Sequence, residues 1–271
     1  MKSYQLTGLS IADTGSPVQT YDQLGGTGIV FNKALAIPVH LGHPWNSIEY
    51  VVIPPPLTDG QESSVGEHLQ HTDEIYYIHR GTGVLVTNGI SCEVGPGFLA
   101  IAPRGTRHGI RNTSSREELA FLVVELVPPH DEYISQPGEI ASLPALLEDS
   151  DAFHPASLGI REVRLRVASI DLTRYCSAPW GRLALVEMPP GSRIHPYTEE
   201  AHDENLFVLS GNASITVAEE RFYTWEHGLN ALIPRGVPRA IINRSSVEPL
   251  LFLSLLVCRE GEERDENRTA A

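Results

Sequence analysis

Lysine is the residue that this chain lacks most clearly, and basic residues are scarce in general. Only two lysines, Lys2 and Lys33, occur among the 271 residues, and 34 aspartates and glutamates outnumber 20 lysines and arginines to give a formal net charge of −14. A protein that binds nucleic acid needs a basic surface that neutralises phosphates. The composition therefore argues against a nucleic-acid partner.

Cysteines and long apolar runs are also scarce. The three cysteines, Cys92, Cys176 and Cys258, form no CxxC pair, so neither a disulfide framework nor a thiolate metal site is indicated. No apolar run reaches the roughly 18 residues that a membrane helix needs, and the first residues lack the apolar segment of a signal peptide. We therefore expect a cytoplasmic protein with no membrane partner.

An internal repeat organises what the sequence does contain. The first copy runs through Glu74, Gly81, Gly97, Pro103, Gly105 and Asn112, and the second through Glu204, Gly211, Gly228, Pro234, Gly236 and Asn243. The first two pairs are 130 residues apart and the other four are 131 apart, so one inserted residue brings them all into register. Each repeat, of roughly 120 residues, is large enough to bury its own core.

Short β-rich runs separated by glycine and proline occur in both halves, for example at 48–53 and 119–126 and again at 183–187 and 250–257. Evenly spaced strands with turn residues between them are typical of antiparallel sandwiches and barrels. We predict an all-β protein of two tandem barrels. The expected boundaries are residues 1–127 for the first barrel, 128–160 for a linker with a short helix around Leu143 to Leu147, 161–258 for the second barrel and 259–271 for a charged tail.

Four side chains of the first copy suit a metal ion. His68 and Gln70 are two residues apart on a predicted strand and therefore share a face, Glu74 begins the next strand, and His108 follows a Pro-Gly turn. A barrel would bring these strands onto one interior surface. Imidazole, carboxylate and amide oxygen together favour one divalent transition metal (Fe, Mn, Ni, Co, Cu or Zn) over Ca or Mg.

These residues resemble the two motifs of the cupins, a family of small jelly-roll type β-barrels. The second cupin motif is complete at Gly97, Pro103, Gly105, His108 and Asn112, and the first is matched at His68, Glu74 and Gly81, although Glu62 replaces its leading glycine. The resemblance implies a bicupin whose metal ligands are His68, Glu74 and His108. The fourth position falls on Gln70, where the family usually has histidine.

Gln70 leaves three arrangements open. The glutamine can bind the metal through its amide oxygen, His71 can take its place through a local bulge, or the protein can supply three ligands and leave more positions for water and substrate. Strand alternation favours Gln70. Glu74 and Tyr76 are the candidate catalytic residues, because Tyr76 shares the face of Glu74 and could donate a proton to a bound substrate; alternatively, Tyr76 only fills the barrel.

The second copy does not keep the ligand side chains. The constant offset predicts Thr198, Glu200, Glu204 and Arg239 in place of His68, Gln70, Glu74 and His108. An arginine puts a permanent cation where the metal would bind, so we predict an ion pair between Glu204 and Arg239. The metal is expected only in the N-terminal barrel, and the second barrel is expected to be structural, a dimerisation surface or a lid.

The resemblance implies an enzyme without selecting its reaction. We expect a metal-dependent dioxygenase or lyase of secondary metabolism or small-molecule catabolism, which acts on a small organic substrate as a homodimer. A non-redox Lewis-acid isomerase, cyclase, dehydratase or hydrolase is the alternative, and the glutamine at position 70 favours it. A second alternative is a non-catalytic ligand-binding or storage bicupin.

Overall fold

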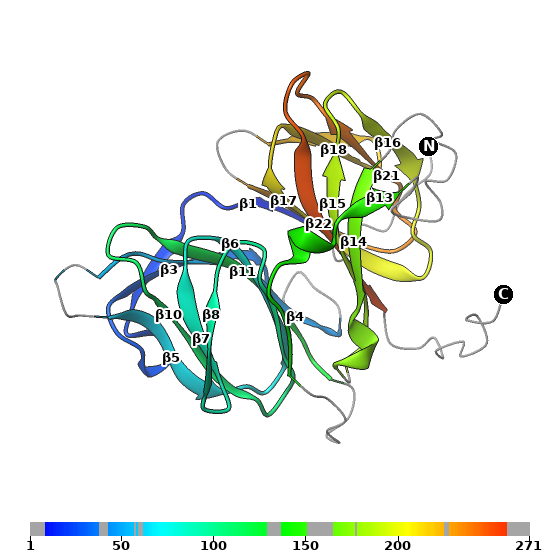
Figure 1. Cartoon of the computed structure of the whole chain (residues 1–271). Helices are drawn as coiled ribbons and strands as arrows, with labels where there is room; N and C mark the ends of the chain where they lie inside the picture. The colour runs from blue at the N-terminus through cyan, green and yellow to red at the C-terminus, as the bar shows by residue number, and fades with distance from the viewer. Residues whose placement is uncertain are drawn as a thin grey trace.

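Four antiparallel β-sheets make up the computed structural model, which describes residues 9–37, 43–56, 58, 62–128, 137–150, 165–176, 178–224 and 228–258. They form two barrels, each built from a seven-stranded and a four-stranded sheet (Figure 1). The described residues contain only short 3-10 turns as helix: η1 (Gln23–Gly25), η3 (Leu143–Leu146) and η5 (Leu172–Arg174). No helix among them is long and apolar enough to cross a membrane. The predicted all-β, two-barrel fold is confirmed.

The first barrel combines a large sheet of order β12-β9-β6-β11-β4-β3-β2 with a small sheet of order β5-β10-β7-β8. The large sheet contains β2 (Val18–Tyr21), β3 (Ile29–Ala36), β4 (Trp45–Ile53), β6 (Asp73–Arg80), β9 (Leu99–Ala102), β11 (Leu119–Leu126) and β12 (Gly138–Ile140). The small sheet contains β5 (Ser63–Leu69), β7 (Gly83–Thr87), β8 (Ile90–Val94) and β10 (Arg107–Asn112).

The second barrel repeats this plan with sheets of order β1-β20-β17-β22-β15-β14-β13 and β16-β21-β18-β19. Its large sheet contains β1 (Ser10–Asp13), β13 (Glu148–Ser150), β14 (Leu165–Asp171), β15 (Trp180–Met188), β17 (His202–Ser210), β20 (Leu229–Ile233) and β22 (Leu250–Cys258). Its small sheet contains β16 (Arg193–Tyr197), β18 (Ala213–Val217), β19 (Glu220–Tyr223) and β21 (Arg239–Asn243).

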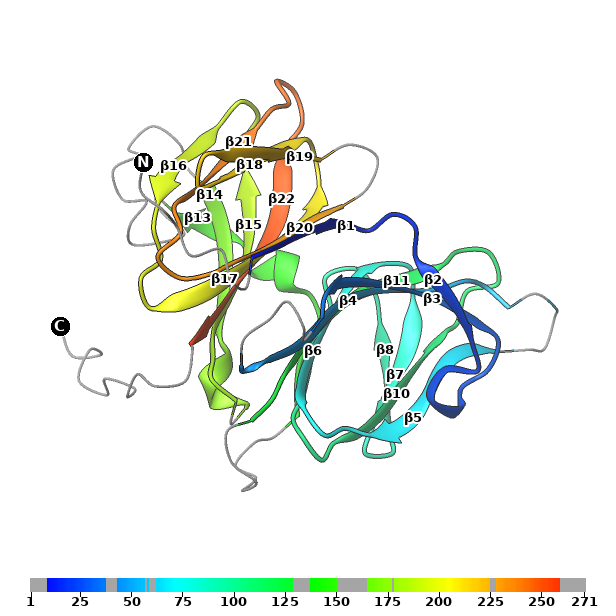
Figure 2. The same ribbon diagram turned by 180° about the vertical axis from the view of Figure 1, so that it is seen from behind.

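Edge strands connect the two barrels in a way that sequence order does not suggest. β1 lies in the range expected for the first barrel, yet it pairs with β20 of the second, with Ser10 opposite Leu232 (Figure 2). In the expected linker, β12 pairs with β9 of the first barrel and β13 with β14 of the second. The helix expected around Leu143 to Leu147 is the 3-10 turn η3 between them. The expected charged tail, 259–271, lies outside the described residues.

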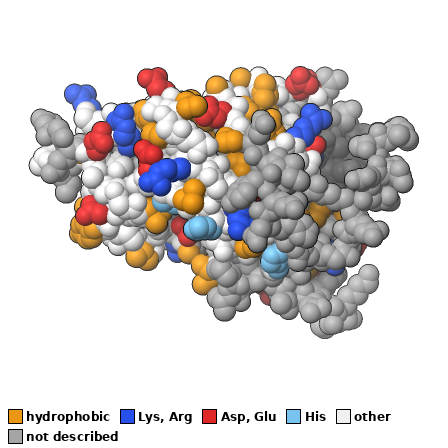
Figure 3. All heavy atoms as spheres, turned by 90° about the horizontal axis from the view of Figure 1, so that it is seen from below, with side chains coloured by type: hydrophobic (Ala, Val, Ile, Leu, Met, Phe, Trp, Pro, Cys, Tyr) orange, Lys and Arg blue, Asp and Glu red, His pale blue; other side chains and the backbone are white. Residues whose placement is uncertain are grey.

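The central strands of the large sheets are buried on both faces, which explains their nearly continuous apolar runs. On β4, Val51 and Ile53 belong to the core of the first barrel, whereas Tyr50 and Val52 belong to a layer shared by both barrels. This inter-barrel layer includes Tyr50, Val52, Ile75, Tyr77, Leu122 and Val124 from the first barrel and Leu183, Leu185, Phe207, Leu209, Leu253 and Leu255 from the second. On the side of the molecule seen in Figure 3, acidic, basic and apolar side chains of the described residues are interspersed.

Two buried aspartates connect the two barrels through hydrogen bonds. Asp73 accepts hydrogen bonds from the backbone N–H of Arg104 in its own barrel and of Ala178 in the other, both at 2.8 Å. Asp203, its counterpart in the repeat, accepts from the backbone of the equivalent Pro-Arg-Gly turn at 3.0 Å and from the indole Nε1 of Trp45 at 3.1 Å. Each carboxylate therefore reaches from one barrel into the other.

We expect Asp203→Ala to lower the free energy of unfolding by about 2–4 kcal/mol, because it removes the acceptor of two donors, the Arg235 N–H and the Trp45 indole. Glu220→Ala, at an exposed position of β19, is the control and should change it by less than about 0.5 kcal/mol. Urea unfolding measures both. A loss in Asp203→Ala no larger than in the control would contradict a structural role for this contact.

Candidate metal centre

Three of the four predicted ligands converge inside the first barrel. His68 lies on β5, Glu74 on β6 and His108 on β10, and the two histidines are opposite each other in the β5–β10 ladder. One ligand atom from each lies within 4.8 Å of the others, and Glu74 Oε2 is 3.0 Å from His108 Nε2. Ligand atoms bound to one ion at about 2.1 Å are at most about 4.2 Å apart, so small side-chain rotations bring the three into range.

The surroundings of His68 orient it for metal binding. Its Nδ1 lies 3.0 Å from the carbonyl oxygen of Gly66. Because a carbonyl oxygen can only accept, Nδ1 carries the proton and Nε2 keeps its lone pair, which is how metal-binding histidines are held. His108 is 1% exposed, and its Nδ1 has no hydrogen-bond partner among the described residues. Two imidazoles and a carboxylate fit a divalent transition metal.

Tyr76 joins the two buried ligands. Its hydroxyl donates to Glu74 Oε2 at 2.6 Å and lies 2.8 Å from His108 Nε2. Burial and the adjacent Glu74 carboxylate raise the pKa of the Tyr76 phenol well above its ordinary value of 10.0. The phenol is therefore a permanent hydrogen-bond donor at neutral pH in the metal-free protein, and it fixes the positions of both neighbours.

Gln70 and His71 are placed very differently. Gln70 is 9% exposed and lines the cavity with His68 and Glu74, and its Oε1 accepts a hydrogen bond from the backbone N–H of His71 at 3.1 Å. His71 itself is exposed and does not line this cavity. The structure therefore brings Gln70, and not His71, to the cluster.

The cluster opens onto a cavity of about 220 Å³ inside the barrel. Its wall is formed by Gln23, Leu24, Glu49, Val51, Val65, His68, Gln70, Glu74, Tyr76, Ile110, Phe121, Val123 and Glu125. The cavity is smaller than the typical site for a drug-sized ligand, so it suits a small molecule. Three of these residues are glutamates and none is lysine or arginine.

One wall of the cavity comes from the loop that contains η1, which supplies Gln23 and Leu24. This loop lies directly on β5 through a contact of two glycines, since a Cβ added to Gly66 would be 2.4 Å from the backbone nitrogen of Gly26. Any side chain at Gly66 would push the loop away. The glycine pair thus sets how closely this wall approaches the cavity.

Glu49 and Glu125 are site residues that the motif search missed. Both interrupt apolar strand runs, and each shares a face with apolar core residues: Glu49 with Val51, and Glu125 with Val123. A charged residue on the inward face of a predicted strand was the available signal. Burial first, and then the Glu74 carboxylate, raise the pKa of Glu125 to about 7 and also raise that of Glu49.

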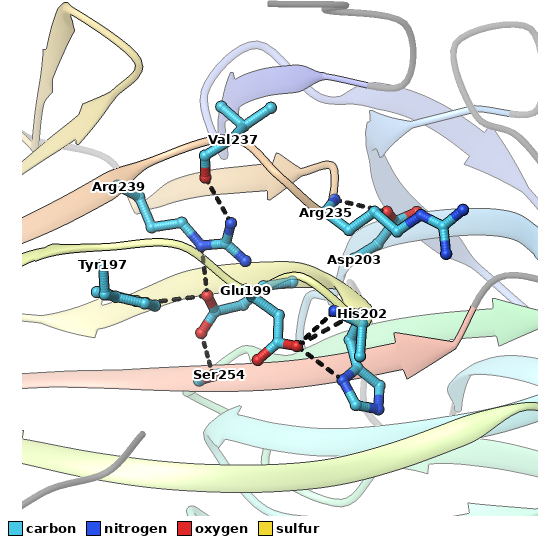
Figure 4. Close-up of polar contacts among 10 residues, drawn as sticks. Tyr197, Glu199, His202, Asp203, Arg235, Val237, Arg239 and Ser254 are labelled. Atoms are coloured by element: carbon cyan, nitrogen blue, oxygen red, sulfur yellow. Dashed lines mark hydrogen bonds and ion pairs between the residues drawn. The ribbon is translucent and has the colours of Figure 1, made fainter. Parts of the chain in front are cut away.

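An ion pair occupies the corresponding place in the second barrel. Arg239 Nε donates to Glu204 Oε2 at 2.8 Å, and both side chains are 0% exposed. The Tyr197 hydroxyl donates to the same oxygen at 2.9 Å and the Ser254 hydroxyl to the other oxygen. The side chains of Arg239, Tyr197 and Ser254 point toward one another in Figure 4. The predicted Glu204–Arg239 ion pair is confirmed.

The predicted counterparts of His68 and Gln70 were wrong by one residue. Tyr197, and not Thr198, lies opposite Arg239 as His68 lies opposite His108. The Glu199 carbonyl, and not that of Glu200, accepts from the repeated turn as the Gln70 carbonyl does. The second copy has four residues between Glu199 and Glu204 where the first has three between Gln70 and Glu74, and a constant offset hides this insertion.

Comparison of sequences places the chain in a family. The cupin domain matches residues 58–125 and 184–256, together more than half of the 271 residues, so the chain belongs to the cupin family. The two matched segments lie in the two barrels, which makes it a bicupin. No curated protein sequence matches the chain.

Several solved structures share the fold. Protein Ylba from E. coli has a TM-score of 0.68 at 14% identity, covering 95% of this chain and 94% of that one. AerE from Microcystis aeruginosa has a TM-score of 0.63 at 14% identity, with 90% and 98% covered. Oxalate decarboxylase from Bacillus subtilis has a TM-score of 0.61 at 15% identity, with 92% and 76% covered. At these identities the likeness shows the fold alone.

The raised pKa of Glu125 predicts how the metal-free protein responds to pH. Its folded-state pKa of about 7 exceeds the ordinary 4.5, so the folded protein keeps a proton that the unfolded chain releases, and stability is lost as the pH rises between these values. We expect Glu125→Gln to be more stable than the wild type by about 2 kcal/mol at pH 8 and nearly equal to it at pH 5. Urea unfolding in the presence of EDTA measures this. An equal difference at both pH values would contradict it.

The buried ion pair of the second barrel predicts that removing one of its charges destabilises the protein more than removing both. Arg239→Met leaves the Glu204 carboxylate buried without its cation and should cost about 3–5 kcal/mol of unfolding free energy. The double variant Glu204→Gln/Arg239→Met should cost less, because neither charge of the pair is left without the other. Chemical unfolding of the two variants checks this, and a single variant at least as stable as the double one would contradict the assignment.

Proposed function

We propose that this bicupin is a mononuclear metal-dependent enzyme that acts on a small organic molecule in its N-terminal barrel. The observation that carries the proposal is the convergence of His68, Glu74 and His108, of which His68 and Glu74 line a 220 Å³ cavity. Two imidazoles and a carboxylate would hold the ion, and the cavity leaves room for a ligand beside it. A storage protein would have no use for a buried cluster that opens onto a cavity.

We assign the fourth position to Gln70 and not to His71. Gln70 lines the cavity with His68 and Glu74, whereas His71 is exposed. Its amide oxygen accepts a hydrogen bond from the next backbone N–H, so it would have to rotate to face the ion. It is therefore a weaker ligand than the other three.

Manganese is the first metal to test. B. subtilis oxalate decarboxylase, which shares the fold, has Mn(II) centres, and the donor set here also suits Fe, Co, Ni, Cu and Zn. A bound ion would supply a Lewis acid that polarises a substrate oxygen. The substrate of that enzyme is not carried over, because oxalate is a dianion and the cavity here has three glutamates and no lysine or arginine in its wall.

Residues of the protein would position the ligands, bind the ion and transfer protons. Tyr76 is a positioning residue, because its hydroxyl donates to Glu74 and lies within hydrogen-bond distance of His108, which holds both side chains in place. Glu74 acts as a ligand. Glu125 lines the same cavity, directly opposite Glu74 on the neighbouring strand, so its carboxyl group is placed to give a proton to a bound ligand or take one from it.

We therefore propose a lyase or isomerase reaction in which a proton moves to or from the substrate. A metal-dependent oxygenase is the second candidate, because two histidines and one carboxylate with open positions are also the ligand set of non-haem iron oxygenases. Turnover that continues without oxygen would support the first and exclude the second. The homodimer, the cytoplasmic location and a role in secondary metabolism stay predictions.

Metal content is the direct test of this site. The wild type should bind about one Mn(II) per chain, and His68→Ala and His108→Ala should weaken binding by at least about tenfold. His71→Ala is the matched control, three residues from His68 but exposed, and should bind as the wild type does. Elemental analysis and competition with a chelator measure this. Unchanged binding in His68→Ala, or lost binding in His71→Ala, would contradict the assignment.

A further inference from the structure

The cavity of the first barrel carries more negative charge than its metal cluster needs. Glu49 on β4, Glu125 on β11 and Glu74 on β6 lie on three adjacent strands and face the same cavity. Glu125 is directly opposite Glu74, and Glu49 is opposite Val123, two residues along β11. The three carboxylates therefore form a row that starts at the metal cluster and leads away from it across the sheet.

The second barrel shows that the fold does not require this row of carboxylates. The position of Glu49 is taken by Ala184, which pairs with Ser254 as Glu49 pairs with Val123. The position of Glu125 is taken by Leu256, which pairs with Glu204 as Glu125 pairs with Glu74. A barrel of this family closes with an alanine and a leucine there. Burying two carboxylates opposes folding, so their presence in the first barrel points to what that barrel binds.

The two extra carboxylates differ in how they are held. Glu125 Oε2 accepts hydrogen bonds from the Asn46 amide and, at 3.3 Å, from the Thr72 hydroxyl. The Glu49 side chain makes no hydrogen bond or ion pair within the described part of the chain, although it is half-buried in the cavity wall. Glu49 is thus the carboxylate that is available to a ligand.

We propose, resting on the proposed function, that the substrate carries a positively charged nitrogen, such as a primary ammonium or amidinium group, and that Glu49 binds it and determines specificity. The oxygen-bearing end of the substrate would face His68, Glu74 and His108. Adjacent strands are about 4.8 Å apart, so β4 and β6, with β11 between them, are separated by about 10 Å at the backbone. The charged nitrogen therefore lies a few bonds from the oxygen.

Charge selects between substrates at such a site. A cation is attracted by the carboxylates at a point where the cavity wall offers no lysine or arginine, whereas an anion of the same shape is repelled. A neutral analogue is neither attracted nor repelled by the charge of the carboxylates. The predicted order of affinity is cation, neutral compound, anion.

Three probes of one length test this order: 3-amino-1-propanol, 1,3-propanediol and 3-hydroxypropanoate. With protein loaded with Mn(II), isothermal titration calorimetry should show the amino alcohol binding at least about tenfold more tightly than either of the other two. In Glu49→Gln this preference should fall to less than about threefold. Glu67→Gln is the matched control, because Glu67 is an exposed glutamate on β5 of the same barrel, and it should keep the full preference.

The metal content of each variant separates the two proposals. Wild-type protein that takes up no metal contradicts the proposed function. Wild-type protein that takes up Mn(II) yet binds the three probes equally, or binds none of them, overturns the inference about the substrate and leaves the metal site standing. Loss of metal in Glu49→Gln would also overturn it, since Glu49 would then serve the metal and not a ligand.

Discussion

The inter-barrel layer is the constraint on which the rest of this structure depends. Successive side chains of a strand point to opposite faces. On β6, Glu74 and Tyr76 therefore point into the first barrel, and Ile75 and Tyr77 point into the inter-barrel layer. A slip of one residue would exchange the ligand face with the apolar face, and the packing of the second barrel forbids it. Asp73, at the start of the same strand, is tied to the Ala178 N–H of the second barrel. The second barrel therefore holds the strand that carries the proposed metal ligand.

The two barrels stabilise a buried glutamate in different ways. Both keep a buried glutamate at one place in the barrel, and a buried carboxylate without a partner is costly. In the second copy Arg239 neutralises Glu204 permanently, with Tyr197 and Ser254 completing the hydrogen bonds. In the first copy no lysine or arginine side chain lines the cavity around Glu74, which is contacted by the Tyr76 hydroxyl and His108. An exchangeable metal cation in the first barrel would do what the fixed guanidinium does in the second, and it leaves open positions that a guanidinium does not.

Much of the site could be predicted because its residues sit at fixed places in a repeated frame. Turn glycines and prolines are set by backbone geometry, so they mark the register between the two copies, and that register predicted the Glu204–Arg239 pair. The candidate ligands His68, Glu74 and His108 came from their residue types and from the resemblance to the cupin motifs. The all-β fold followed from strand length and spacing. These signals are local, and local geometry is what a sequence pattern records.

The parts that were missed depend on contacts between distant segments. The pairing of β1 with β20 joins residues more than two hundred positions apart, and no local pattern specifies it. Glu49 and Glu125 were concealed inside apolar runs, because both faces of β4 and β11 are buried and alternation is lost. The one-residue insertion after Glu199 could be recognised only once strand pairing showed Tyr197 opposite Arg239.

A crystal structure of protein loaded with Mn(II), with anomalous diffraction recorded at the manganese absorption edge, tests the central claim most directly. The account predicts one anomalous peak per chain, within about 2.3 Å of His68 Nε2, a Glu74 carboxylate oxygen and His108 Nε2, and no peak between Glu204 and Arg239. A first barrel without a peak, or a peak bound by His71 or lying in the second barrel, would contradict it.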